Sequence, residues 1–138
     1  MNRAIVLFLF LASASCGVPK LESAACTEAK DAVREFYSYH FGHDMKFSPE
    51  GLKAREKFLT LEFAGAMSGA PAGTDPFTTG TTDIPRAFRV GECHDLTPER
   101  TESEVLLLWR DDARTEQRTI VIETVDKNDR WLVNAISR

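Results

Sequence analysis

Residues 102–125, ESEVLLLWRDDARTEQRTIVIETV, decide the fold because they contain two β-rich runs joined by a short polar connection. The two runs, Glu102–Arg110 and Gln117–Val125, are rich in β-branched, aromatic and other apolar residues, as strands usually are. Between them, the four residues Asp111-Asp112-Ala113-Arg114 have the length and polarity of a hairpin connection. Two more strands are predicted at Arg86–His94 and Trp131–Ser137. We therefore expect an antiparallel sheet of about four strands whose last three form a meander.

The run Val105–Trp109 is apolar at successive positions, which is unusual for a strand with one face in water. Both faces of this strand therefore need cover. Helices can cover one face of the sheet. For the other face, the sequence leaves two alternatives open, the segment Gly69–Pro85 or a second subunit.

Two helices are predicted before the sheet. The first begins with Thr27 as its N-cap and runs to about Phe41, with its apolar residues at spacings of three and four. The second begins at Ser48 and ends near Gly69, with Lys53, Arg55, Lys57 and Glu62 facing water. The chain is thus expected to be an α+β protein with two N-terminal helices packed on a curved antiparallel sheet.

The first fifteen residues have the features of a secretory signal. Arg3 supplies a positive charge, an apolar run from Ala4 to Ala12 follows, and small residues come next. An apolar run of about nine residues is too short for a helix that spans a membrane. We expect residues 1–15 to be a signal peptide, 16–25 a tether and 26–138 a single α+β domain. This organisation predicts an exported protein that is periplasmic, membrane-anchored or secreted.

Three cysteines occur in this exported chain, and an odd number requires an account of the third thiol. Residues 13–17 resemble a bacterial lipobox, in which Cys16 would be lipidated, whereas Ala12-Ser13-Ala14 would allow ordinary cleavage. Lipidation of Cys16 would leave Cys26 and Cys93 to form a disulfide. The alternative is that these two cysteines are buried and unpaired.

Charge and motifs exclude several classes of function. The net charge is −4 and no basic run is present, so a nucleic-acid partner is not expected. No phosphate-binding loop, nucleophile elbow or metalloprotease motif occurs, and no cofactor is predicted. His40, His43 and Asp44 lie at a helix end without an assured common face, so we predict no metal site. Cys93 and His94 are strand neighbours and point to opposite faces.

The segment Gly69–Pro85, GAPAGTDPFTTGTTDIP, is the place where length alone indicates function. Loops beyond about 12–15 residues in a compact domain are usually functional or disordered. We predict that Asp75-Pro76-Phe77 is the main contact region. The candidate ligand-binding residues are Tyr37, His40, Asp75, Phe77, Asp83 and Trp109.

Four short segments carry a family resemblance: Val33-Arg34-Glu35-Phe36-Tyr37, Asp75-Pro76-Phe77, Phe88-Arg89-Val90-Gly91 and Arg130-Trp131-Leu132-Val133. Together with the order of elements, they make the chain resemble a bacterial family known as domain of unknown function 3828. That resemblance implies an NTF2-like or cystatin-like organisation. It implies no catalytic residue, because the family has no accepted activity to transfer.

Three functional hypotheses follow. The first is a non-enzymatic binding domain of the cell envelope, which would bind a protein or small ligand. The second is a small NTF2-like enzyme with His40 or Asp83 as a general base, in an apolar pocket lined by Tyr37, Phe63, Phe77 and Trp109. The third is a structural protein that forms a homodimer through the second face of its sheet.

Overall fold

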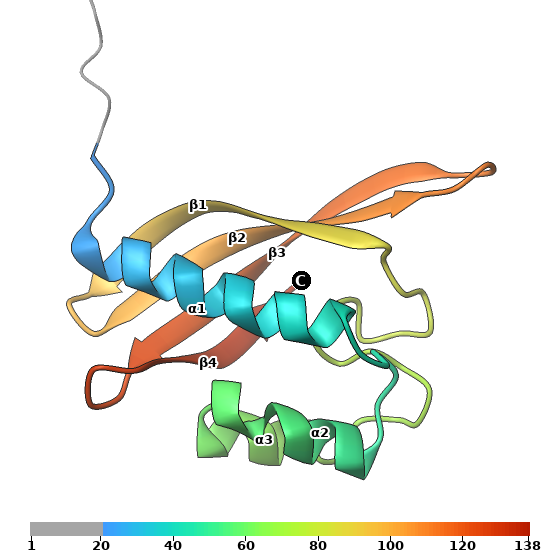
Figure 1. Cartoon of the computed structure of the whole chain (residues 1–138), viewed down its shortest axis with the longest axis horizontal. Coiled ribbons are helices and arrows are strands. Elements are labelled where there is room, and N and C mark those ends of the chain that lie inside the picture. The colour runs from blue at the N-terminus through green and yellow to red at the C-terminus, as the bar shows by residue number, and fades with distance from the viewer. Residues whose placement is uncertain (1–20) are drawn as a thin grey trace, which may run out of the picture.

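The computed structural model describes residues 21–138 (Figure 1). The signal peptide, Cys16 and the first part of the tether lie outside the described residues. A long helix, α1 (Ala24–Phe41), is followed by α2 (Pro49–Arg55), the short 3-10 helix η1 (Glu56–Phe58) and α3 (Leu61–Met67). The strands are β1 (Ala87–Thr97), β2 (Arg100–Arg110), β3 (Thr115–Asp126) and β4 (Trp131–Ser137). None of the helices in residues 21–138 is long and apolar enough to cross a membrane.

The four strands form one antiparallel sheet in the order β1-β2-β3-β4. Helix α1 crosses one face of this sheet, and α2 and α3 lie below it near β4 (Figure 1). This arrangement confirms the predicted α+β fold with helices packed on an antiparallel sheet. The predicted strand starts and ends lie within three residues of those in the structure, because the alternation of apolar and polar residues indicates strands well.

Helix α1 begins earlier than predicted. Ser23, rather than Thr27, is the N-cap, and its hydroxyl accepts a hydrogen bond from the backbone N–H of Cys26. Ser23 also donates to Asp95 at the end of β1, so contacts with the sheet fix where the helix starts. One turn later, Cys26 is joined to Cys93 by a disulfide, with the two Cα atoms 5.7 Å apart. The predicted bridge is confirmed.

The second predicted helix is three separate elements. Helix α2 ends at Arg55, and after η1 the chain extends at Leu59 and Thr60 before α3 begins. Thr60 caps α3 through its hydroxyl, while its backbone N–H donates to the carbonyl of Val133 in β4. The prediction of one continuous helix was wrong because this edge of the sheet takes a backbone partner from the middle of the segment.

The two faces of the sheet have different surroundings. The face toward α1 carries the core, in which Val105, Leu107 and Ile122 are completely buried. On the outer face, Leu106 and Leu108 are only partly buried. The segment Gly69–Pro85 packs on the α1 side of the sheet: Asp75 contacts His40 of α1, and Asp83 forms an ion pair with Arg118, the register partner of the inward-facing Leu107. Of the two predicted kinds of cover, the loop is therefore excluded by its position.

Candidate functional site

Four of the six candidate ligand-binding residues meet in the interior. Tyr37 and His40 come from α1, and Asp75 and Phe77 come from the Gly69–Pro85 segment. All four are at most 2% exposed. The phenol of Tyr37 donates to the carbonyl of Phe77 at 2.7 Å, and the ring of Phe77 packs against Phe36.

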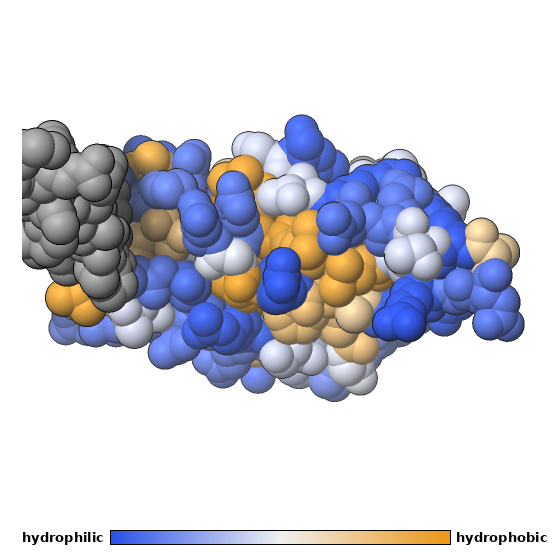
Figure 2. All heavy atoms as spheres, turned by 90° about the horizontal axis from the view of Figure 1, so that it is seen from above, coloured by the Kyte–Doolittle hydropathy of each residue, from blue (hydrophilic) through white to orange (hydrophobic). Residues whose placement is uncertain are grey.

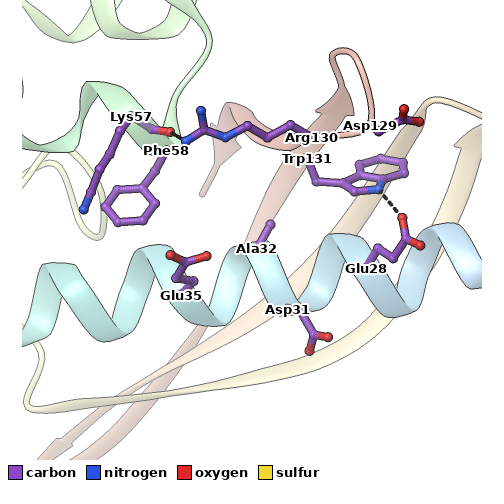
Figure 3. Close-up of a pocket in the computed structure, with 9 residues that line it drawn as sticks. All are labelled: Glu28, Asp31, Ala32, Glu35, Lys57, Phe58, Asp129, Arg130 and Trp131. Atoms are coloured by element: carbon purple, nitrogen blue, oxygen red, sulfur yellow. Dashed lines mark hydrogen bonds between the residues drawn. The ribbon is translucent and has the colours of Figure 1, made fainter.

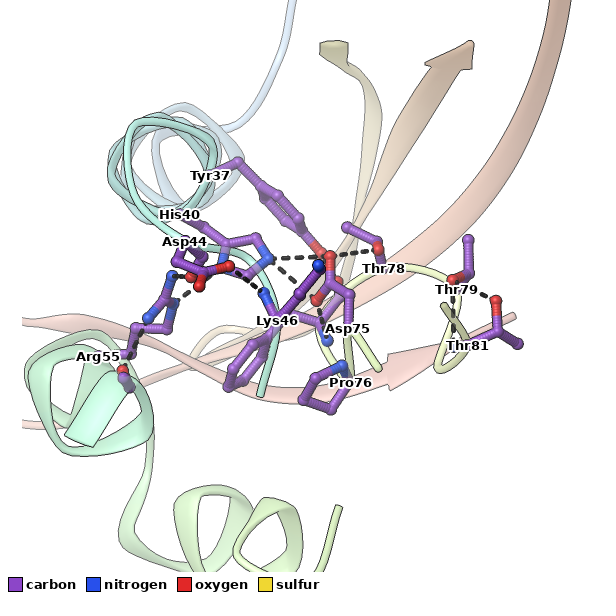
Figure 4. Close-up of polar contacts among 12 residues, drawn as sticks. Tyr37, His40, Asp44, Lys46, Arg55, Asp75, Pro76, Thr78, Thr79 and Thr81 are labelled. Carbon is purple, nitrogen blue, oxygen red and sulfur yellow. Dashed lines mark hydrogen bonds and ion pairs between the residues drawn. The ribbon is translucent and has the colours of Figure 1, made fainter. Parts of the chain in front are cut away.

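A chain of hydrogen bonds joins α2, α1 and the loop (Figure 4). The Nε–H of Arg55 donates to Nδ1 of His40 at 2.8 Å, so the ring proton of His40 lies on Nε2. That nitrogen lies 3.0 and 3.1 Å from the two carboxylate oxygens of Asp75 and donates to them. The sequence pattern predicted that Arg55 is exposed to solvent, but its side chain is buried, with Arg55 only 4% exposed. Its remaining N–H groups donate to the carbonyls of Gly51 and Asp44.

Asp75 organises the loop around itself. Its carboxylate accepts the backbone N–H of Phe77 at 2.9 Å and the hydroxyl of Thr78 at 2.5 Å. Its backbone carbonyl accepts the N–H of Gly80, and Arg138 holds the carbonyls of Pro76 and Thr78 from outside. A buried carboxylate needs this number of donors, because an unpaired buried charge is costly. Asp75 therefore fastens the loop to the domain.

The burial of this network bears on the predicted contact region. Asp75-Pro76-Phe77 is buried among other protein groups, so the triplet presents no side chain to a partner in this structure. Burial also raises the pKa of the Tyr37 phenol well above its usual value, with the charge of Asp75 adding to the effect. We read these four residues as a structural junction.

The other two candidates, Asp83 and Trp109, lie in a second cluster near the β2–β3 hairpin. The indole of Trp109 is stacked under the guanidinium groups of Arg114 and Arg118, which lie 4.9 and 5.0 Å from the ring centre. Arg114 donates to both carboxylate oxygens of Asp83, at 2.9 and 3.1 Å. These hydrogen bonds hold the pKa of Asp83 below its usual range.

The structure gives neither proposed general base a suitable environment. His40 is closed in by protein and holds a carboxylate on one nitrogen and a guanidinium on the other. Asp83 is held as an ion-paired carboxylate at the surface, whereas a general base of the kind expected requires an apolar pocket. No observation on the described residues favours the enzyme hypothesis. Residues 21–138 also contain no group of three side chains placed to hold a metal ion.

A surface groove lies elsewhere, between α1, η1 and the β3–β4 turn (Figure 3). Its volume is about 390 Å³, within the range of small-ligand sites. Phe58 and Trp131 contribute aromatic walls. The polar lining residues are Glu28, Asp31, Glu35, Lys57, Asp129 and Arg130.

The two cations of the groove are already engaged. Arg130 donates to the backbone carbonyl of Lys57, and the ammonium of Lys57 lies 4.7 Å from the ring centre of Phe58. Two of the carboxylates are not engaged: among the described residues, no hydrogen bond or ion pair reaches the side chains of Glu35 and Asp129. The groove therefore offers unpaired negative charge beside aromatic rings.

The turn that supplies Asp129 has an unusual backbone. Asn128 and Asp129 have φ values of 57° and 61°, and the N–H of Lys127 donates to the carbonyl of Arg130. Two successive residues with positive φ are typical of a type I′ hairpin turn, where glycine is strongly preferred at the second position. An aspartate there carries a backbone cost that a glycine would avoid.

Sequence reasoning missed the groove because its residues are far apart in the chain. Glu35 and Asp129 occur in a helix face and a turn that look like ordinary solvated surface. The one local signal was Asn128-Asp129 in a short hairpin, where the sequence lacks the favoured glycine.

Comparisons with known proteins add information about the fold alone. No family model matches the chain, and no curated protein matches it. The chain is similar to a crystal structure of a protein of unknown function from Bacteroides thetaiotaomicron VPI-5482. The TM-score is 0.56 at 18% identity, and the match covers 82% of this chain and 91% of the other. The fold of residues 21–138 thus has a solved counterpart, and the candidate site has to be judged on its own geometry.

Proposed function

We propose that the protein is an exported, non-enzymatic binding domain of the cell envelope whose groove between α1, η1 and the β3–β4 turn binds a small organic cation. The observation that carries this proposal is the preformed groove of about 390 Å³ with Glu35 and Asp129 unengaged beside Phe58 and Trp131. Carboxylates and aromatic faces both attract cations, and the aromatic contribution grows when the cation is desolvated.

The charge balance of the groove favours a positively charged ligand. Four carboxylate residues and two cationic residues line it. Because Lys57 already lies over the Phe58 ring and Arg130 already has a carbonyl partner, an open carboxylate is available to a cation at either end of the groove, Glu35 beside Phe58 and Asp129 beside Trp131 (Figure 3). A primary amine, a quaternary ammonium group or a lysine side chain of a peptide has the required chemistry.

Export and anchoring complete the proposal. The Cys26–Cys93 disulfide is compatible with an oxidising compartment, where such bridges persist. It also accounts for two of the three cysteines, which leaves Cys16 as the residue that the lipobox resemblance assigns to lipidation. We keep the relationship to domain of unknown function 3828 as part of this proposal, resting on the four sequence segments given above.

The binding part can be tested by titrating the exported chain with spermidine, choline and trilysine while tryptophan fluorescence is recorded. We expect a saturable change from at least one cation and none from the dianion glutarate. Trp131→Phe should abolish the change, because Trp131 is the tryptophan in the groove.

The charge variants Glu35→Gln and Asp129→Asn make the test specific. Each variant removes one negative charge from the groove. Because two opposite unit charges 4 Å apart in water attract each other by roughly 1 kcal/mol, the loss of one such pair should raise the Kd about fivefold. Asp112→Asn, which alters an exposed aspartate in the β2–β3 turn, is the matched control and should leave the Kd unchanged. The proposal fails if no cation gives a saturable response at about 10 mM, or if glutarate binds equally well.

The export part is tested by the intact mass of the chain from membrane and soluble fractions, with thiol labelling before and after reduction. We expect a membrane-associated mass that begins at an acylated Cys16, with no labelled thiol before reduction and two after. A soluble chain that begins at Ser15 would contradict the anchor.

A further inference from the structure

The outer face of the sheet has an ordered distribution of charge along β2. Residues of β2 alternate between the two faces, so the outward series is Arg100, Glu102, Glu104, Leu106, Leu108, Arg110. Acidic residues therefore lie on one side of two leucines, and a basic residue lies on the other. Arg100 is already paired with Glu123 of β3. Among the described residues, no ion pair involves Glu104 or Arg110.

On the neighbouring strands, one register partner of the two leucines is apolar and the others are polar or charged. Leu108 lies between Ala87 of β1 and Gln117 of β3, and Leu106 lies between Arg89 of β1 and Thr119 of β3. A hollow of about 700 Å³ adjoins Leu108, Ala87 and Arg110. On the side of the molecule that is uppermost in Figure 1, apolar side chains gather near the middle with hydrophilic ones on either side (Figure 2).

We propose that this outer face binds a second copy of the chain in a two-fold symmetric dimer. A two-fold axis that lies between the two sheets, perpendicular to β2 and above the midpoint of Leu106 and Leu108, reverses the direction of β2 in the second copy. Leu106 then faces Leu108 of the second copy. Glu104 and Arg110, each three residues from the midpoint, face Arg110 and Glu104 of the second copy.

The charges select this arrangement over the alternative. If the two copies of β2 ran in the same direction, Glu104 would face Glu104 and Arg110 would face Arg110, and like charges across an interface are unfavourable. The reversed arrangement forms two ion pairs, one on each side of the contact between Leu106 and Leu108. It is an aligned sheet packing of the kind found in β-sandwiches, with the sheets about 10 Å apart.

The size of the face fits a stable dimer. Strand β2 has 11 residues, which at about 3.3 Å each span about 36 Å. Four strands at a spacing of about 4.8 Å give a width of about 19 Å, hence a projected area of about 700 Å². Stable interfaces bury roughly 800 Å² per partner. The dimer leaves the groove of each copy open, because the groove is bordered by α1 on the other face of the sheet.

Sedimentation equilibrium of the exported chain tests this inference, with Cys16→Ser in every variant so that no lipid anchor contributes to association. We expect a concentration-dependent monomer–dimer equilibrium. Glu104→Arg and Arg110→Glu should each weaken the dimer more than about tenfold, because either change places like charges together at two symmetric positions. The double variant Glu104→Arg with Arg110→Glu should restore association. Asp112→Arg, also an exposed charge reversal but in the β2–β3 turn, should have no effect.

Three outcomes would overturn the inference. The first is a protein that remains monomeric up to about 1 mM, which would leave the face for a different partner. The second is a dimer that neither single charge reversal weakens, which would place the interface elsewhere. The third is a double variant that fails to recover, which would exclude the reversed register. Circular dichroism of each variant checks that the fold is retained, which is expected because both side chains are exposed.

Discussion

Substitution of Asp75 by alanine should detach the Gly69–Pro85 segment and destabilise the whole domain. The side chain of Asp75 is completely buried and accepts hydrogen bonds from Phe77, Thr78 and His40. Its removal leaves three buried donors without an acceptor, each at a cost of about 1–3 kcal/mol. Because partial relaxation and water entry recover some of this, we expect a loss of about 3–6 kcal/mol, against a total stability of about 5–15 kcal/mol for a typical domain.

Urea and thermal unfolding followed by far-ultraviolet circular dichroism measure this loss, with the disulfide kept oxidised. In a domain of this size, each kcal/mol of lost stability lowers the midpoint of thermal unfolding by about 3 °C or more. The midpoint of the Asp75→Ala variant should therefore fall by at least about 10 °C. Asp112→Ala, an exposed aspartate in the β2–β3 turn, is the matched control and should leave the midpoint unchanged. A fall of less than about 3 °C in the Asp75→Ala variant would refute the view that this carboxylate fastens the loop.

Three further predictions concern the disulfide, the buried phenol and the strained turn. The double variant Cys26→Ser with Cys93→Ser should lose about 4 kcal/mol in urea unfolding, because the bridge joins residues separated by 67 positions; equal stability would contradict this. Burial raises the pKa of Tyr37 in the folded state, so its contribution to stability is fully present below the unfolded pKa of about 10 and is lost as pH rises further. Tyr37→Phe should reduce that alkaline decline and lower stability at pH 7 by about 1 kcal/mol, whereas an unchanged alkaline unfolding curve would argue against a raised pKa. Asp129→Gly should raise the free energy of unfolding by up to about 1 kcal/mol, because glycine adopts a positive φ without strain, and it should weaken cation binding. A loss of stability in urea unfolding would show that the turn is not strained.

The sheet could be predicted from the sequence because its signals are local. Alternation in Gln117–Val125 and the apolar run Val105–Trp109 place both strands, and the polar residues between them mark the hairpin. The break between α2 and α3 could not be predicted in this way. Thr60 looks like one more polar position on a helix face, and its role as a cap depends on the carbonyl of Val133 in β4.

The candidate site could be predicted only in part, for a related reason. The sequence predicted one ligand-binding site of six residues. Four of them meet in the structure, among them His40 and Asp75, but the sequence could not distinguish a ligand pocket from a closed structural junction. The deciding residue is Arg55, which reads as a solvated helix residue and is in fact buried against His40. The groove depends on Glu35 and Asp129, which are almost a hundred positions apart and have no shared local signal.

The most direct test of the proposed function is a heteronuclear NMR titration of the isotopically labelled protein with trilysine. We predict saturable shifts of the backbone amides of Glu35 and Asp129 and of the indole N–H of Trp131, while the amides of the β2–β3 hairpin stay in place. The absence of shifts at these three residues, or shifts confined to the hairpin, would contradict the assignment of the groove as a cation-binding site.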